Sequence, residues 1–251
     1  MTDLDDFWPP SAGVTRRRPE STRTHHGRRD KALSRDEIVQ AAVALADSEG
    51  GGAVNMRRIA KELDVGAMSL YWHVADKERL LDLMLDLAEG ENGAAELSGD
   101  WREDLGQIAR QRRRMLLRHP WIVDFMSGRP PFGPNALLEI ERSLSVFDHL
   151  DVDTRTALYI LTTIDTYVTG SVLHELRELR VEHAQFREGL TATEIAGDVQ
   201  VWKERLDRSG RFARVVRVFD EGIDPDAAET RDERFDFGLD CVLDGVGALL
   251  S

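Results

Sequence analysis

The segment from residue 55 to residue 81 constrains the fold more than any other part of the sequence. Asn55 is a good N-cap, and apolar residues follow it at helical spacing: Met56, Ile59, Ala60 and Leu63. A turn at 64–66 then breaks the helix, a segment of barely two turns runs from Ala67 to His73, and Asp76 caps a third helix. Two short helices joined by such a turn predict a helix-turn-helix.

The second short helix exposes at least one large aromatic side chain. Leu70 and Val74 share one inward face, and neighbouring helix residues differ by about 100°, so Tyr71 and Trp72 cannot both point inward. Tyr71 and His73 can hydrogen-bond to phosphate, and Trp72 can press against a thymine methyl group. One exposed tyrosine is usually ordinary surface, so only the joint placement favours a nucleic-acid contact.

Two basic residues flank this segment. Arg57 opens the first short helix and can reach a guanine edge with two hydrogen bonds. Lys77 opens the third helix, where its charge adds to the helix dipole to favour a phosphate. Each is also an ordinary solvated side chain when considered alone.

Charge is divided unevenly along the chain. The formal net charge is −13, yet residues 14–79 carry 13 Lys and Arg against 10 Asp and Glu, and residues 80–251 carry 20 against 33. A phosphate backbone is therefore expected to meet the N-terminal third. Residues 1–33 form a flexible basic arm, which either contacts phosphates or a minor groove or is a solvated tail.

The rest of the chain predicts an all-α fold without convincing strands. After residues 34–80, which hold the helix-turn-helix, residues 81–251 form a larger helical domain, with a long helix over about 154–189, a weaker pair over 191–220 and a final helix from about Glu229. The final helix has a coiled-coil-like seam: Phe235, Leu239, Val242, Val246 and Leu249. Cys241, the only cysteine, is expected to be a buried small hydrophobe rather than a redox sensor.

Compartment and chemistry follow from what the sequence lacks. It has no apolar run of the roughly 20 residues that a membrane span needs and no secretion signal, so we expect a cytoplasmic protein. No Ser/His/Asp set, metal-spaced Cys/His cluster or glycine-rich phosphate loop is present. We therefore expect no catalytic residues, no metal site and no cofactor.

The residues from Met56 to Val74, followed by Asp76-Lys77-Glu78-Arg79-Leu80-Leu81, resemble the DNA-binding domain of the TetR family of bacterial repressors. The C-terminal part resembles the tetracycline-repressor branch of that family through three stretches: Arg118 to Trp121, Gly128 to Asn135, and Thr169 to Leu173. This resemblance implies an all-helical homodimer. Its small domains would read double-stranded operator DNA, and its larger domains would bind a small-molecule effector and dimerise through a four-helix bundle.

The resemblance also assigns DNA contacts. It implies base contacts from five residues: Arg57, Ala67, Met68, Ser69 and Trp72; it implies phosphate contacts from three: Tyr71, His73 and Lys77. Asp64 stands where the family commonly has glycine, and aspartate tolerates the left-handed conformation better than most residues. Ala67 and Met68 offer only apolar contacts, so sequence preference should depend on thymine methyls and Arg57.

The effector site departs further from the tetracycline repressor. Phe125 stands where that repressor has a magnesium-binding histidine, and His174 replaces the acidic residue that supports the metal. We therefore expect an effector other than magnesium-tetracycline, in a pocket lined by Trp121, Phe125, Arg129, Asp165 and His174. Asp165 could instead be a core or inter-subunit carboxylate, and His174 a buried histidine satisfied by its neighbours.

The leading hypothesis is an effector-responsive repressor. A dimeric DNA-binding or interaction protein without an effector is the alternative, and an all-α enzyme is the least favoured.

Overall fold

The structure is a computed structural model that describes residues 33–91, 93, 96–125, 133–189 and 191–250. Within these residues every regular element is an α-helix or a short 3₁₀ helix, and none is a strand. The predicted all-α class is therefore confirmed. No helix in the described ranges has both the length and the apolar character needed to cross a bilayer.

The chain divides into two compact units, one extending to Thr162 and one covering Thr163–Leu249. Helix α8 contributes residues to both units. The predicted domain limits, 1–33, 34–80 and 81–251, stay predictions, and the basic arm lies outside the described residues apart from Leu33.

The first unit begins with α1, Arg35–Glu49, at the capping box that the sequence contains. Ser34 Oγ accepts a hydrogen bond from the Glu37 backbone N–H at 3.1 Å, and the Glu37 carboxylate accepts one from the Ser34 backbone N–H at 3.0 Å. These bonds satisfy two otherwise free amide groups and fix where the helix starts. The 3₁₀ helix η2, Gly51–Ala53, follows α1.

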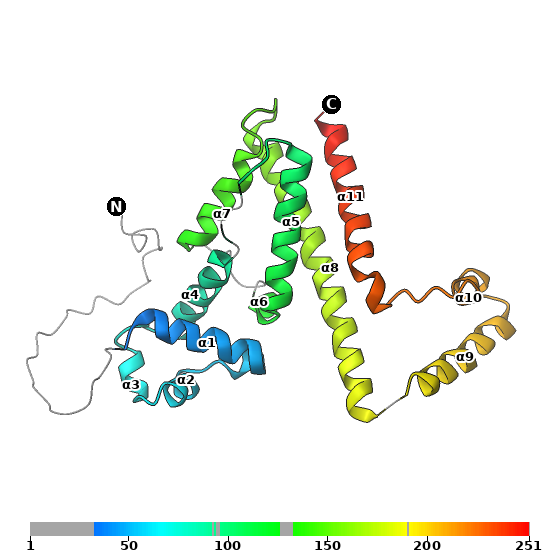
Figure 1. Cartoon of the computed structure of the whole chain (residues 1–251), viewed down its shortest axis with the longest axis horizontal. Coiled ribbons are helices and arrows are strands. Elements are labelled where there is room, and N and C mark those ends of the chain that lie inside the picture. The colour runs from blue at the N-terminus through cyan, green and yellow to red at the C-terminus, as the bar shows by residue number, and fades with distance from the viewer. Residues whose placement is uncertain (1–32, 92, 94–95, 126–132, 190, 251) are drawn as a thin grey trace, which may run out of the picture. The chain divides into compact units, whose positions relative to one another are not determined.

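Three further helices complete the small N-terminal bundle: α2, Met56–Glu62; α3, Ala67–Leu70; and α4, Lys77–Gly90. Asn55 and Asp76 cap α2 and α4, as predicted, by accepting hydrogen bonds from backbone N–H groups three residues ahead. The bundle core contains fully buried side chains from all four helices: Ile38, Ile59, Leu70, Leu80 and Met84. Figure 1 shows the four helices of this bundle, α1 to α4, next to one another.

The larger part of the first unit adds three helices: α5, Trp101–Arg118; α6, Trp121–Phe125; and α7, Pro134–Ser145. Asp100 caps α5 with two hydrogen bonds, and His119-Pro120 ends this helix. Helix α7 begins at Pro134, because proline is favoured in the first helical turn. Residues after Ser145 form turns instead of extending it.

The second unit contains most of α8, Thr154–Glu188, with α9, Ala192–Ser209; α10, Ala213–Asp220; η3, Ala228–Thr230; and α11, Arg231–Leu249. Helices α8 and α11 lie side by side (Figure 1), and the Tyr167 hydroxyl donates a hydrogen bond to the Phe235 carbonyl at 2.6 Å. Any side chain at Gly238 would collide with the Tyr167 ring, so the close approach requires glycine there.

Two expectations for the final helix are corrected. Phe235, Leu239 and Val246 are buried, but the predicted seam is completed by Leu243, while Val242 is half-buried and Leu249 is exposed. Cys241 is exposed, so its predicted burial is wrong. The physical reason is helical geometry, because a residue two positions from buried Leu239 is rotated by about 200° away from it.

Candidate nucleic-acid interface and effector domain

The segment from Gly66 to Val74 presents its aromatic side chains to solvent. Leu70 and Val74 are almost completely buried, whereas Trp72 is 73% and Tyr71 is 42% exposed. Burial of the aliphatic face turns the intervening residues outward, because successive helix residues differ by about 100°. The sequence required one exposed ring, and the structure exposes both.

The turn before this segment keeps the expected geometry although it lacks a glycine at Asp64. Asp64 has φ of 52°, in the left-handed region that aspartate tolerates. Gly66 then precedes α3, and its carbonyl accepts a hydrogen bond from the Ser69 N–H at 2.8 Å. The regular α-helix is only one turn long, and the chain continues as a turn in which the Leu70 carbonyl accepts from the N–H groups of His73 and Val74, both at 2.9 Å.

Adjacent arginines on α2 have different surroundings. Arg58 forms ion pairs with Glu49 and with Glu62, one helical turn ahead. Arg57 is exposed, and Lys77 is exposed at the first position of α4. The exposed charges at Arg57 and Lys77 are the basic groups that sequence analysis selected for DNA.

All eight predicted DNA-contacting residues therefore lie on α2, on α3 and the turn after it, or at the start of α4. Seven of them are exposed, and Ala67 is half-buried: Arg57, Ala67, Met68, Ser69, Tyr71, Trp72, His73 and Lys77. Their contacts with DNA stay a prediction.

Trp121 and Phe125, two of the predicted pocket residues, pack against the N-terminal bundle. Trp121 is buried and its indole Nε1–H donates to Asp47 Oδ1 on α1 at 2.7 Å. A β-carbon at Gly51 would lie only 2.5 Å from the Phe125 ring, so this ring sits directly on η2. Both side chains thus join α6 to the bundle, and their part in an effector pocket stays a prediction.

His119 bridges the same region to the end of α4. Its buried ring places Nδ1 2.7 Å from Asp47 Oδ1 and Nε2 3.0 Å from Glu91 Oε2. Burial opposes ionisation of Glu91, but hydrogen bonds from His119 and Arg118 outweigh it and lower the Glu91 pKa. The imidazole therefore connects α1, the end of α4 and the segment before α6.

A second connection clamps α4 to α7. The Asp86 carboxylate accepts hydrogen bonds from the backbone N–H groups of Asn135 at 2.9 Å and Ala136 at 3.1 Å. Asn135 Nδ2 also donates to the Asp86 carbonyl at 3.0 Å. Burial raises the Asp86 pKa despite these donors, and a β-carbon at Gly133 would overlap the Asp86 side chain.

Sequence reasoning missed this clamp. It noted Gly133-Pro134-Asn135 only through family resemblance, and Asp86 lies 49 residues earlier than Asn135. An acidic residue at a buried position of an amphipathic helix is the signal that could have shown it, since buried carboxylates need donors.

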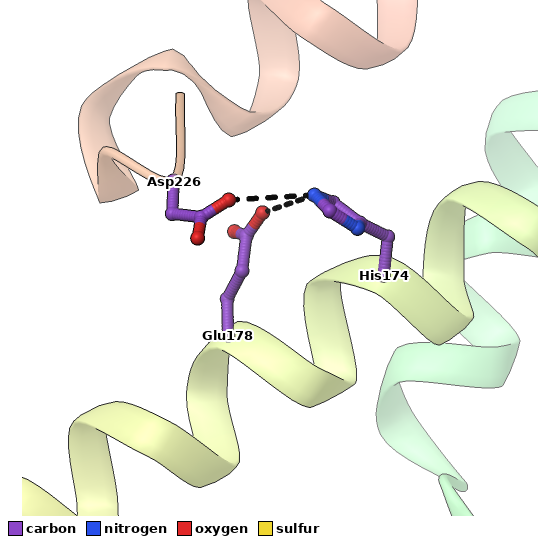
Figure 2. A group of neighbouring side chains, drawn as sticks. All are labelled: His174, Glu178 and Asp226. Atoms are coloured by element: carbon purple, nitrogen blue, oxygen red, sulfur yellow. Dashed lines mark ion pairs between the residues drawn. The ribbon is translucent and has the colours of Figure 1, made fainter. Parts of the chain in front are cut away.

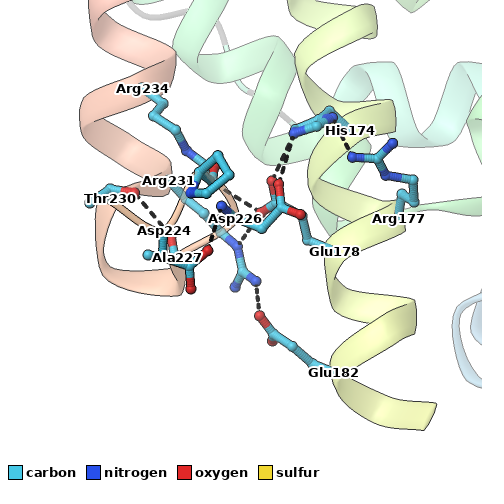
Figure 3. A network of polar contacts seen from close by, with 11 residues as sticks. His174, Arg177, Glu178, Glu182, Asp224, Asp226, Ala227, Thr230, Arg231 and Arg234 are labelled. Atoms are coloured by element: carbon cyan, nitrogen blue, oxygen red, sulfur yellow. Dashed lines mark hydrogen bonds and ion pairs between the residues drawn. The ribbon is translucent and has the colours of Figure 1, made fainter. Parts of the chain in front are cut away.

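Of the three remaining predicted pocket residues, the structure describes only Asp165 and His174. Arg129 lies outside the described residues, and Asp165 is half-buried on α8. His174 is about half exposed, so the alternative of a buried histidine is wrong, and its Nε2 lies 3.0 Å from Glu178 Oε1. Figure 3 shows that the Glu178 carboxylate also faces the arginines at the start of α11. The predicted pocket draws on both units and stays a prediction.

These features define a helix-turn-helix protein with a larger helical domain. A family model described as "Bacterial regulatory proteins, tetR family" matches residues 38–84, and one described as "Tetracyclin repressor-like, C-terminal domain" matches residues 94–250. The chain belongs to the TetR family, and it is a DNA-binding transcriptional repressor of a non-enzymatic family.

Individual relatives are similar over most of the chain. The repressor DrrR1 of Streptomyces coeruleorubidus is 34% identical over 227 residues, which are 87% of this chain and 79% of the relative. The class E tetracycline repressor of Escherichia coli is 29% identical over 154 residues, or 60% of this chain and 72% of that protein. The crystal structure of ActR from Streptomyces coelicolor in complex with actinorhodin aligns with a TM-score of 0.68 at 29% identity, covering 88% and 99% of the two chains.

Proposed function

We propose that this chain is a homodimeric repressor that binds double-stranded operator DNA through α2, α3 and the start of α4. A small-molecule effector other than magnesium-tetracycline releases it. The main support for this DNA-binding surface is that Met68, Tyr71 and Trp72 are exposed, whereas the neighbouring Leu70 and Val74 are buried. Solvent-facing aromatic and apolar groups on one short helix suit the floor of a major groove, where thymine methyls offer apolar contacts.

The two arginines on α2 give a matched test of this surface. We expect Arg57→Ala to weaken operator binding by about 1–3 kcal/mol, because a bidentate guanine contact contributes that much. Arg58→Ala should weaken it less, since the Arg58 guanidinium already pairs with Glu49 and Glu62. The measurement is fluorescence anisotropy with DNA from upstream of the protein's own gene, against a scrambled duplex of equal length. Equal binding to both duplexes would contradict the proposal.

In this proposal, effector binding changes the DNA-binding surface through α4. Asp86 ties α4 to α7, and Glu91 ties its end to His119, which also contacts Asp47 of α1. A ligand that favours another arrangement of α5 to α7 thereby favours another position of α1 and α4. Release requires the effector to bind this second state more tightly than the DNA-bound state.

The absence of the tetracycline-binding groups supports a different effector. Phe125 packs on Gly51 of η2 and has no metal-ligating atom, and His174 offers an imidazole nitrogen where Mg²⁺ prefers oxygen ligands. ActR was crystallised in complex with actinorhodin, so actinorhodin is a reasonable first probe. Dissociation of the operator complex by magnesium-tetracycline would contradict this part of the proposal.

Exposed apolar side chains support the homodimer. Phe237 on α11 is 73% exposed, and Leu173 and Val181 on α8 are about half exposed. Large exposed apolar groups on two adjacent helices are typical of a surface that a second copy covers. Phe237→Asp should shift the protein toward monomer in light scattering after gel filtration, and an unchanged dimer would remove α11 from the interface. Because operator DNA lies in the cytoplasm, we place the protein there.

A further inference from the structure

Three side chains with metal-ligating atoms converge in the second unit (Figure 2). His174 and Glu178 lie one turn apart on α8, and Asp226 lies in the segment before η3. His174 Nε2 is 3.0 Å from Glu178 Oε1 and 3.5 Å from Asp226 Oδ1, and all three ligand atoms lie within 4.8 Å of one another. His174 is also one of the predicted effector-pocket residues, whereas Glu178 and Asp226 have no part in the repressor function described above.

Glu178 is the anchored member of the cluster. Its side chain is 1% exposed, and Oε2 accepts hydrogen bonds from Arg231 Nε at 3.0 Å and Arg234 Nη2 at 2.9 Å. Oε1 is also buried but has no hydrogen-bond partner among the described residues.

Glu178 Oε1 makes an ion-pair contact with His174 Nε2 at 3.0 Å, but it has no hydrogen-bond partner among the described residues. A nitrogen and an oxygen 3.0 Å apart normally form a hydrogen bond, but here the contact does not have that geometry. Two ligands of one tetrahedral ion, each about 2.0–2.1 Å from the metal, lie roughly 3.3–3.4 Å apart. The two distances from His174 Nε2, 3.0 and 3.5 Å, lie on either side of that value.

The third ligand is held in place by its own backbone. The Asp226 N–H donates to Asp224 Oδ1 at 3.0 Å, and the Pro225 carbonyl accepts a hydrogen bond from Arg234. Figure 3 shows Asp224, Asp226 and Arg234 around this turn. Arg234 therefore positions both Glu178 and the turn, as outer-shell partners of metal ligands do.

We propose that His174, Glu178 and Asp226 bind a divalent transition-metal ion such as Zn²⁺. Nε2, Oε1 and Oδ1 are the protein ligands, and the fourth position is left to water or a bound molecule. One imidazole and two carboxylates favour Zn²⁺, Co²⁺ or Ni²⁺ over Mg²⁺ or Ca²⁺, which prefer oxygen ligands alone. Arg231 also pairs with Glu182, so part of its positive charge is neutralised outside the site.

Arg177 gives a second test of the proposal, because its removal should strengthen metal binding whereas removal of a ligand should weaken it. Its guanidinium nitrogen lies 3.1 Å from His174 Nδ1. A guanidinium only donates, so this contact makes Nδ1 an acceptor and leaves the ring hydrogen of the neutral imidazole on Nε2, where the metal must bind. Removing Arg177 should therefore strengthen metal binding, because Nδ1 can then carry the hydrogen and one nearby positive charge is gone.

The experiment titrates Zn²⁺ into the chelator-treated full-length protein by calorimetry, with Co²⁺ absorption as a second readout. We expect one ion per chain in this site, with at least about tenfold weaker binding in His174→Ala and Asp226→Asn. His183→Ala is the matched control, because His183 is an exposed histidine on the same helix outside the cluster. Arg177→Ala should bind Zn²⁺ more tightly than the wild type.

Equal affinity in the wild type and His174→Ala, or no saturable binding by the wild type, would overturn the proposal. A Co²⁺ spectrum with thiolate charge-transfer bands would also overturn it, since the proposed ligands contain no sulfur. Circular dichroism of each variant separates lost binding from lost folding, and His174→Gln provides a conservative second variant. Operator binding by metal-free protein tests the repressor function separately, so the two proposals can fail independently.

Discussion

Trp72 and Leu70 lie two positions apart and give the sharpest test of the recognition surface. Trp72 is 73% exposed, so only about a quarter of a side chain that buries roughly 150–250 Å² when fully enclosed is covered. At about 25 cal/mol per Å², Trp72→Ala should lower the free energy of unfolding by at most roughly 1–2 kcal/mol. Leu70 is fully buried, and Leu70→Ala should cost about 2–5 kcal/mol.

Operator affinity should show the reverse order for these substitutions. Loss of the indole removes an apolar contact in the groove, and we expect Trp72→Ala to weaken binding by about 1–3 kcal/mol, or roughly 5- to 150-fold. Urea unfolding followed by circular dichroism and operator anisotropy on the same samples measure both quantities. If Trp72→Ala unfolds as easily as Leu70→Ala, or binds the operator like the wild type, the assignment of this face to DNA is refuted.

Three further predictions concern other parts of the first unit. Lys77→Ala should weaken binding to all DNA sequences and reduce the slope of log affinity against log salt by about one, and an unchanged slope would remove Lys77 from the phosphate contacts. Gly133→Ala should lower the free energy of unfolding by about 2–4 kcal/mol, because the new β-carbon overlaps Asp86 and displaces its hydrogen bonds. Gly170→Ala is the control and should be neutral or stabilising, since Gly170 is a helical glycine with open space around it. Equal effects of the two substitutions would contradict the clamp between Asp86 and α7. The pKa of Glu91 is lowered in the folded state, so its stabilising contribution is present above its unfolded pKa of about 4.3 and is lost as the pH falls through the folded value. Glu91→Gln should therefore lose less stability than the wild type as the pH falls. Urea unfolding midpoints measured over a pH series test this.

Local features of the fold could be predicted because their causes lie within a few residues. Asn55 and Asp76 are caps whose hydrogen bonds span three positions, and each starts the helix that the sequence indicates. The same reasoning applies to Thr191 with Glu194, a capping box that starts α9 and that the sequence analysis did not use.

The long-range contacts could not be predicted in this way. His119 meets Asp47 across 72 positions and Glu91 across 28, and neither helical spacing nor composition shows which carboxylates a histidine will face. The metal cluster shows the same limit. His174 and Glu178 have the one-turn spacing of two ligands on a helix, but Asp226 reaches them only through the pairing of α8 with α11.

Helix α4 explains how the two connections could act together. One end carries Lys77 at the proposed DNA surface, and the other carries Asp86 and Glu91, which hold α7 and His119. A helix of 14 residues is about 21 Å long and transmits a tilt imposed at one end to the other, because its backbone hydrogen bonds keep it stiff. The buried carboxylate of Asp86 and the lack of room for a β-carbon at Gly133 leave little freedom for α4 to slide on α7. In the proposed mechanism, an effector that displaces α7 therefore moves the start of α4 as well.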